Sequence, residues 1–213
     1  MNEKPQELRL GFHADLDRID QRVVRLFALV CEGVAAANEA LLGDDSDALA
    51  AVRRGEATID ELMAEIEADI ERLLALQAPV ARDLRYALAI IRIVPELERS
   101  GDLAEHIAKR AGSGLAAQLT PTARGMLERM GSVSAVLWRA AADGFADRDA
   151  TVGERLEEDD DELDDLHTAL TAELLSGGVP AAVAADATLV ARFYERLGDH
   201  AVHIAKRIST AVG

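Results

Sequence analysis

Carboxylates and an imidazole occur twice in this chain at the spacing of helical turns. Residues 98–110 return as residues 195–207, 97 positions later, and ten of the thirteen residues are identical. Each copy carries a glutamate, an aspartate and a histidine at i, i+4 and i+8, which are Glu98, Asp102 and His106, then Glu195, Asp199 and His203. Carboxylate oxygens with an occasional imidazole are ligands for Fe, Mn, Mg or Zn. A repeat kept only for packing would retain its apolar residues, so this one indicates a chemical role and a tandem duplication.

Each copy is preceded by a second acidic pair. Residues 56–62 align with residues 160–166, and the pairs are Glu56 with Asp60 and Asp160 with Asp164. Residues four apart lie on nearly the same face of a helix, about 6 Å from each other. Each half of the chain therefore offers two acidic pairs, one on its middle helix and one on its last. These eight carboxylates are the candidate metal ligands, and His106 and His203 are additional candidates.

A solvated acidic face is the alternative interpretation of these residues. Two carboxylates four apart repel each other by a few tenths of a kcal/mol, and a di- or trivalent cation would remove that repulsion. A surface histidine near an aspartate is often only hydrogen-bonded. The Lys-Arg pair that ends each copy lies in the last turn of a helix, where positive charge interacts favourably with the helix dipole. In the third helix the acidic stripe lies roughly 170° around the helical wheel from the apolar line. We therefore expect it to face outward or into a shallow groove.

Glycine and proline residues predict local differences. Gly101 and Gly198 recur inside helices, although glycine costs about 1 kcal/mol there relative to alanine. They predict close helix approach, or room for something bound beside the acids. Pro95 removes a backbone hydrogen bond and is expected to bend the third helix, whereas its counterpart Arg192 should not bend the sixth. We therefore expect the two acidic sites to be non-equivalent.

Composition and periodicity predict an all-α fold of two tandem antiparallel three-helix bundles. Aromatic residues make up only 3% of the 213 residues, and valine, isoleucine and threonine form no strand-like runs. Apolar residues step by three and four from residue 19 to 41, and five more such segments follow. Pro79 and Pro121 are expected in the first turns of the third and fourth helices. Breaks are expected at residues 43–47, 112–114, 143–149 and 176–180, and the two repeats at residues 8–112 and 120–211.

The charge and the absence of known motifs exclude several classes of function. The net charge is −16, which opposes binding to nucleic acid and to anionic membranes. The first residues contain no apolar stretch of a signal peptide, and no uninterrupted apolar run reaches the ~18 residues of a transmembrane helix. We therefore expect a cytoplasmic protein without membrane insertion or nucleic-acid binding. No nucleophile–base set, glycine-rich phosphate loop or CxxC pair is present, so no enzyme activity is expected.

The duplicated frames resemble a known family. Residues 98–102 and 195–199 are similar to the paired E(D)xxxD motifs of the PhoU family, and residues 79–85 resemble its Pro-x-Ala-x-Asp-Leu-Arg stretch. The similarity covers nearly the whole chain, with six helices in two repeats and a motif near the end of each. His106 and His203, where the family more usually has asparagine, and Pro95 depart from the family pattern.

The resemblance implies a cytoplasmic, often homodimeric, all-helical negative regulator of the phosphate-starvation response. Family members link the ATPase subunit of the phosphate ABC transporter to a membrane sensor histidine kinase and modulate phosphate uptake. They can carry Fe or Zn on the acidic motifs, and Mn and Mg are further candidates here. The resemblance gives the ligand role to Glu98, Asp102, Glu195 and Asp199, and the middle-helix acids are added on spacing alone. The competing hypotheses are a carboxylate-based metal-binding protein or metalloenzyme, and a purely structural helical dimer.

Overall fold

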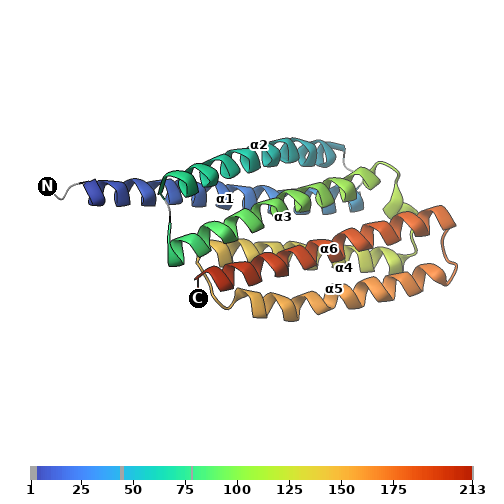
Figure 1. Ribbon diagram of the computed structural model, residues 1–213. Coiled ribbons are helices and arrows are strands. Elements are labelled where there is room, and N and C mark those ends of the chain that lie inside the picture. The colour runs from blue at the N-terminus through green and yellow to red at the C-terminus, as the bar shows by residue number, and fades with distance from the viewer. Residues whose placement is uncertain (1–3, 44–45, 78, 213) are drawn as a thin grey trace.

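The computed structural model describes residues 4–43, 46–77 and 79–212, and these residues are almost entirely helical (Figure 1). Within these ranges six long helices follow one another, and a short 3-10 helix, η1, lies between the third and the fourth. Their bounds are α1 Lys4–Gly43, α2 Ser46–Gln77, α3 Ala81–Ala111, η1 Leu115–Gln118, α4 Pro121–Ala146, α5 Val152–Leu175 and α6 Ala181–Val212. The prediction of an all-α fold is confirmed.

The two halves of the chain form two three-helix bundles that lie against each other (Figure 1). α1 packs on α2 and α3 in the first bundle, and α6 packs on α4 and α5 in the second. Across the interface α1 packs on α4, and α3 packs on α6. α3 and α6 run in opposite directions, because Ser100 meets His200 at 2.9 Å while Glu96 meets Arg207 near the end of α6. This antiparallel crossing brings the two duplicated frames side by side.

One apolar core joins both bundles. Its largest fully buried side chains include Phe27 from the first bundle and Trp138 and Tyr194 from the second. The ring centroids of Phe27 and Trp138 lie 6.5 Å apart across the interface. The Tyr194 hydroxyl donates to Asn38 Oδ1 at 2.7 Å, and Asn38 Nδ2 donates to the Gly131 carbonyl oxygen at 2.8 Å. The side chain of Asn38 therefore ties α1 to both α4 and α6 by hydrogen bonds.

The long apolar helix α1 is a core element. By length and composition alone, its segment Gly11–Gly43 is apolar enough to cross a membrane. One face of this helix, however, is buried, and six of its apolar side chains at mostly three- and four-residue steps are at most 1% exposed: Ile19, Val23, Leu26, Phe27, Val30 and Val34. Because α1 packs on α2, α3 and α4, this face is buried within the protein. Core packing explains the apolar composition of α1.

Most helix ends follow the predicted turn signals. α3 ends at Ala111, directly before the predicted break at 112–114, and α5 ends at Leu175, directly before the break at 176–180. Thr120 caps α4, since its hydroxyl oxygen accepts a hydrogen bond from the Ala123 N–H at 3.1 Å. Asp44 and Asp45, in the first predicted break, lie outside the described residues.

Two predicted helix boundaries were wrong. Pro79 does not occupy the first turn of α3, because the chain before the helix is extended and the helix begins at Ala81. Gly144 does not end α4, which continues to Ala146. Gly144 instead packs against Val152 at the start of α5, where a Cβ would lie 2.6 Å from a valine methyl carbon. The glycine serves a close helix contact there and not a turn.

Candidate functional site

The first carboxylate cluster lies where α2 packs on α3. It consists of Glu56 and Asp60 from α2 with Glu98, Asp102 and Glu105 from α3. One carboxylate oxygen from each of Glu56, Asp102 and Glu105 lies within 4.8 Å of the other two. Three converging acid oxygens held by two rigid helices are an arrangement that a divalent cation can bridge.

Burial and mutual repulsion raise the pKa values of this cluster. Burial raises the pKa of Glu56 to about 7, aided by a hydrogen bond with Asp102 and by the surrounding negative charges. Burial also raises the pKa of Glu98, and the charges of Asp102 and Asp60 raise it further. Near neutral pH, the first carboxylate cluster therefore favours either a shared proton or a bound cation.

Glu105 is a cluster member that comparison of the two copies missed. It is only 9% exposed, and its carboxylate lies 2.5 Å from Lys109 Nζ and 3.5 Å from Arg53 Nε. In the second copy the same position holds Val202, so a search for residues shared by both copies discards it. The signal that could have found it is spacing, because a residue three positions after Asp102 lies on the same face of the helix.

The second carboxylate cluster lies where α5 packs on α6 and consists of Asp160, Asp164, Glu195 and Asp199. Burial and, after it, the charges of the neighbouring carboxylates, Asp199 first among them, together raise the pKa of Asp160 to about 7. The pKa of Glu195 is also raised by burial. Asp160 Oδ1 and Glu195 Oε2 are buried and have no hydrogen-bond partner among the described residues. Because an unpaired buried acceptor is costly, these oxygens suit a ligand that brings positive charge.

Gly101 and Gly198 let each middle helix approach its motif helix closely. A Cβ at Gly198 would overlap Asp160 Oδ1 and lie 2.6 Å from Leu163 Cδ1. A Cβ at Gly101 would lie 2.8 Å from Cδ1 of Ile59, which is the counterpart of Leu163. The glycines recur because a side chain would push against the neighbouring helix, and at Gly198 it would also displace a cluster carboxylate. The predicted close helix approach is present in both bundles.

The position before each motif differs between the copies. Arg192 on α6 forms an ion pair with Glu195, three residues later. Pro95 occupies the counterpart position on α3 and offers no charge to Glu98, while α3 runs as one helix from Ala81 to Ala111. The two clusters therefore differ in charge at this position, and the bend expected at Pro95 stays a prediction.

The repeated histidines lie beside the opposite bundle. His106 is exposed, its Nδ1 donates to the Asp102 carbonyl oxygen at 2.7 Å, and its ring packs on Phe193 of α6 at a centroid distance of 5.5 Å. His203 is exposed and lines a pocket between α6 and α3. Eight residues advance a helix by about 80° beyond two full turns, so the third position of the frame is turned away from the first. The structure thus brings the carboxylates to the middle helices and the imidazoles to the crossing of α3 and α6.

The repeated arginines reach across between the bundles. Arg207 of α6 donates to Glu96 of α3 at 2.6 Å. Arg110 of α3 lies over the ring of Phe193 in α6, 5.0 Å from its centroid, and 3.7 Å from Asp186. Each copy therefore contributes one arginine to the interface between bundles. These contacts add a specific role to the dipole interaction expected from the sequence.

Each half of the chain matches the same family of known proteins. The PhoU domain matches residues 23–111 and again residues 127–208. The chain belongs to the PhoU family. The resemblance identified from the duplicated acidic frames is confirmed, and so is the fold of two helical PhoU domains.

Known proteins of similar length resemble this chain in sequence, and a solved structure resembles it in fold. Phosphate-specific transport system accessory protein PhoU homolog 2 of Mycobacterium tuberculosis is 35% identical over 206 residues, which cover 94% of this chain and 96% of that protein. The PhoU homolog of Deinococcus radiodurans is 32% identical, covering 94% of this chain and 96% of that protein. The crystal structure of PhoU from Pseudomonas aeruginosa matches with a TM-score of 0.88 at 28% identity, covering 94% of this chain and 98% of that one. This PhoU-family chain is an accessory and regulatory protein and not an enzyme, as predicted.

Proposed function

We propose that this PhoU-family chain is a cytoplasmic negative regulator of the phosphate-starvation response. It couples the ATPase subunit of the phosphate ABC transporter to a sensor histidine kinase and thereby modulates phosphate uptake. The observation that carries the proposal is the match of both halves to the PhoU domain. Relatives named as accessory proteins of phosphate-specific transport align over nearly their full length and support it.

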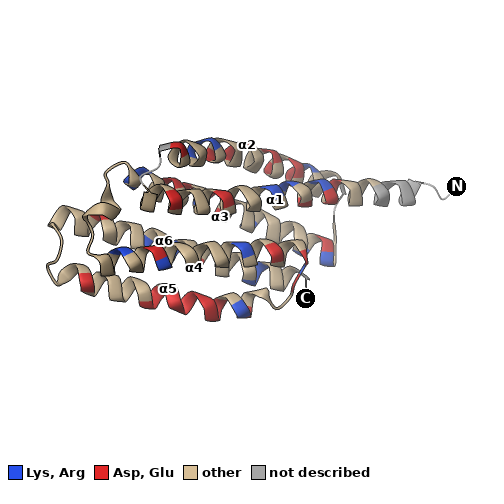
Figure 2. Ribbon diagram, turned by 180° about the vertical axis from the view of Figure 1, so that it is seen from behind, with Lys and Arg blue, Asp and Glu red and all other residues tan. Residues whose placement is uncertain are grey.

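The outer helices are the surfaces that we propose for these partners. α2 makes its main contacts with α1 and α3, and α5 with α4 and α6, so both lie on the outside of the protein (Figure 1). Acidic residues gather on both helices and form a dense run on α5 (Figure 2). An acidic surface favours partners with basic patches and guides their approach. A homodimer, which the family resemblance implies, belongs to the same proposal.

We further propose that both carboxylate clusters hold metal ions, with Fe or Zn as the first candidates and Mn or Mg as alternatives. The first cluster offers converging oxygens, and the second offers buried oxygens without a hydrogen-bond partner among the described residues. Oxygen donors of this kind fit hard or borderline divalent cations. Asp60 and Asp164 are exposed, which places them at the rims of the clusters. A bound cation would offset the repulsion that raises the pKa values and tie each middle helix to its motif helix.

A deletion strain tests the signalling role. Phosphate-starvation genes should become active in high phosphate when the gene is deleted, and a plasmid copy of the wild type should restore their repression. Silent starvation genes in the deletion strain would contradict the proposal. Affinity capture of the tagged protein from cells in high phosphate should recover the transporter ATPase subunit and the kinase.

A pair of variants tests whether the clusters serve that role. Asp102→Asn with Asp199→Asn should lower metal content and weaken repression. Glu67→Gln with Glu154→Gln is the matched control, because it removes one exposed acidic charge from each half away from the clusters. Metal uptake that is lost in the first variant without any change in repression would favour a metal-binding protein with no signalling role.

A further inference from the structure

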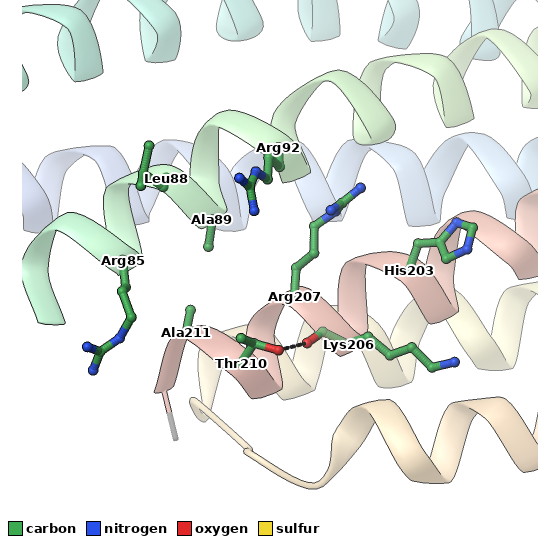
Figure 3. A pocket seen from close by; sticks show the side chains of 9 residues that line it. All are labelled: Arg85, Leu88, Ala89, Arg92, His203, Lys206, Arg207, Thr210 and Ala211. Carbon is green, nitrogen blue, oxygen red and sulfur yellow. Dashed lines mark hydrogen bonds between the residues drawn. The ribbon is translucent and has the colours of Figure 1, made fainter. Parts of the chain in front are cut away.

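A basic pocket lies where the first half of α3 faces the last turns of α6. It has a volume of about 410 Å³, within the range of small-molecule sites. Arg85 and Arg92 line it from α3, and His203, Lys206 and Arg207 line it from α6 (Figure 3). No carboxylate occurs among the described residues that line it. A concentration of cations is unexpected in a chain with a net charge of −16.

Two of these cations have no acidic partner among the residues that the structure describes. Lys206 pairs with Glu157 and Arg207 pairs with Glu96, each at 2.6 Å. Arg85 and Arg92 are exposed, and neither has an ion pair or hydrogen bond with the described residues. They are seven residues apart on α3 and so share one face of the helix, about 10 Å apart along its axis. Their guanidinium groups are therefore available to a ligand that carries negative charge at more than one position.

The duplication supplies an internal comparison for this pocket. The repeated His-x-x-Lys-Arg of α3, residues 106–110, faces the first half of α6 in the same way. There Ala182 and Leu189 stand in place of Arg85 and Arg92. Asp186, the counterpart of Ala89, lies 3.7 Å from Arg110, which Phe193 also covers. The lysine and arginine common to both copies thus have acidic partners at both ends of the crossing. Only the pocket end adds two further arginines.

We propose that this pocket binds an oxyanion with more than one phosphoryl group. Arginine binds phosphoryl oxygens through paired, charge-assisted hydrogen bonds, and two separated arginines match a chain of phosphates better than a single phosphate. Leu88, Ala89 and Ala211 give the pocket an apolar part that can contact a nucleoside. Inorganic polyphosphate and a nucleoside triphosphate share the required chemistry. The proposal does not depend on the signalling role or on metal binding.

Calorimetric titration of the metal-free full chain at constant ionic strength tests the proposal. Inorganic triphosphate should bind saturably with one site per chain, and inorganic phosphate should bind much more weakly. Binding of triphosphate and ATP with similar affinity would identify the phosphate chain as the recognised group, and clearly tighter binding of ATP would show that the nucleoside contributes. The absence of saturable binding, or equal affinity for phosphate and triphosphate, would overturn the proposal.

Matched charge variants locate the binding. Arg85→Gln with Arg92→Gln should weaken triphosphate binding at least about tenfold, because two charge-assisted contacts are lost. Arg25→Gln with Arg139→Gln removes the same charge from exposed arginines on α1 and α4 and should leave the affinity unchanged. Equal losses in both variants would show that the net charge and not the pocket determines binding. Since all four arginines are exposed, unchanged melting temperatures should confirm that the variants fold.

Discussion

Each carboxylate cluster includes residues from one copy of the duplicated frame, and each copy carries a lysine that pairs with a glutamate. The two bundles place this glutamate on different helices. In the first bundle Lys109 pairs with Glu105 on the same helix, α3. In the second bundle Lys206 pairs with Glu157 on the neighbouring helix, α5, at 2.6 Å. Val202 fills the position that Glu105 occupies in the first copy. The lysine has an acidic partner in both halves, although the partner belongs to a different helix.

The two clusters also differ in how their negative charges are paired. In the first cluster Glu56 and Asp102 share a hydrogen bond, and Lys109 and Arg53 approach Glu105. In the second cluster the buried Asp160 Oδ1 has no such partner among the described residues. Basic residues thus neutralise part of each cluster, Lys109 and Arg53 in the first and Arg192 in the second. The second cluster depends more on an external cation, because it keeps two buried oxygens without a hydrogen-bond partner among the described residues. Both copies keep the paired carboxylates, while the charges around them differ.

Metal binding should produce the largest difference between the clusters. A cation at one hundred times its dissociation constant adds about 2.7 kcal/mol per site, or roughly 5–10 °C in melting temperature for a chain of this size. Asp199→Asn should remove more of that increase than Asp102→Asn, because the second cluster holds two buried oxygens without a hydrogen-bond partner among the described residues. Thermal melting with Zn²⁺, Mn²⁺ or Fe²⁺, against metal-free protein, measures the effect. An unchanged melting temperature with every metal, and no metal found by elemental analysis, would show that neither cluster binds a metal ion.

Replacing Gly101 and Gly198 with alanine should give the next largest difference between the two bundles, in the free energy of unfolding. Gly198→Ala should cost about 1–3 kcal/mol in unfolding free energy, because the added Cβ overlaps Asp160 and crowds Leu163. Gly101→Ala meets only the flexible end of Ile59, and the gain of about 1 kcal/mol from alanine in a helix should offset that contact. Chemical denaturation of both variants measures the difference. Equal costs would show that the two glycines serve the same packing role.

The pH dependence of metal-free protein should reveal the raised pKa values. A carboxyl group with a raised pKa binds its proton more tightly in the folded state than in the unfolded chain. For Glu56 and Asp160, with pKa values of about 7, the free energy of unfolding should therefore fall as the pH rises from about 4.5 to 7. Solvent screening reduces each contribution to the order of 1 kcal/mol.

Neutral variants at these two positions are the control for the pH effect. Glu56→Gln and Asp160→Asn should each flatten the decrease, and the two together should flatten it most. Denaturation curves at several pH values measure the slope. A free energy of unfolding that rises over the same pH range in both variants and wild type alike would contradict the raised pKa values.

The smallest effect concerns the glutamates that pair with the repeated lysines. Glu105→Gln should cost roughly 1 kcal/mol, because its side chain is 12% exposed and approached by two cations. Glu157→Gln should cost less than about 0.5 kcal/mol, because the side chains of Glu157 and Lys206 are 60% and 46% exposed. Unfolding free energies at neutral pH test the ranking. A larger cost at Glu157 would reverse the contrast between the two lysine partners.

Most of the fold was predictable because its signals are local. Apolar periodicity identified all six helices, and the cap at Thr120 follows from its side chain and the proline after it. Pro79 and Gly144 were misassigned because the same residue types serve turns and close contacts, and only the neighbouring helix distinguishes these roles. Spacing also predicted the paired acids of the middle and last helices, but it did not identify Glu105, which differs between the copies.

The sequence by itself determined the duplication, the helical fold and the repeated pairs of carboxylates, because repeats, helical period and residue types can be read along one chain. Only the tertiary structure decided which groups meet. The packing of α2 on α3 adds Glu105 to the first cluster, and the antiparallel crossing of α3 and α6 turns both histidines toward the opposite bundle. The same crossing places Arg85 and Arg92 in one pocket with Arg207, which is more than one hundred residues away in the sequence. Helix faces are periodic in sequence, but the partner of each face is set by packing of the whole chain.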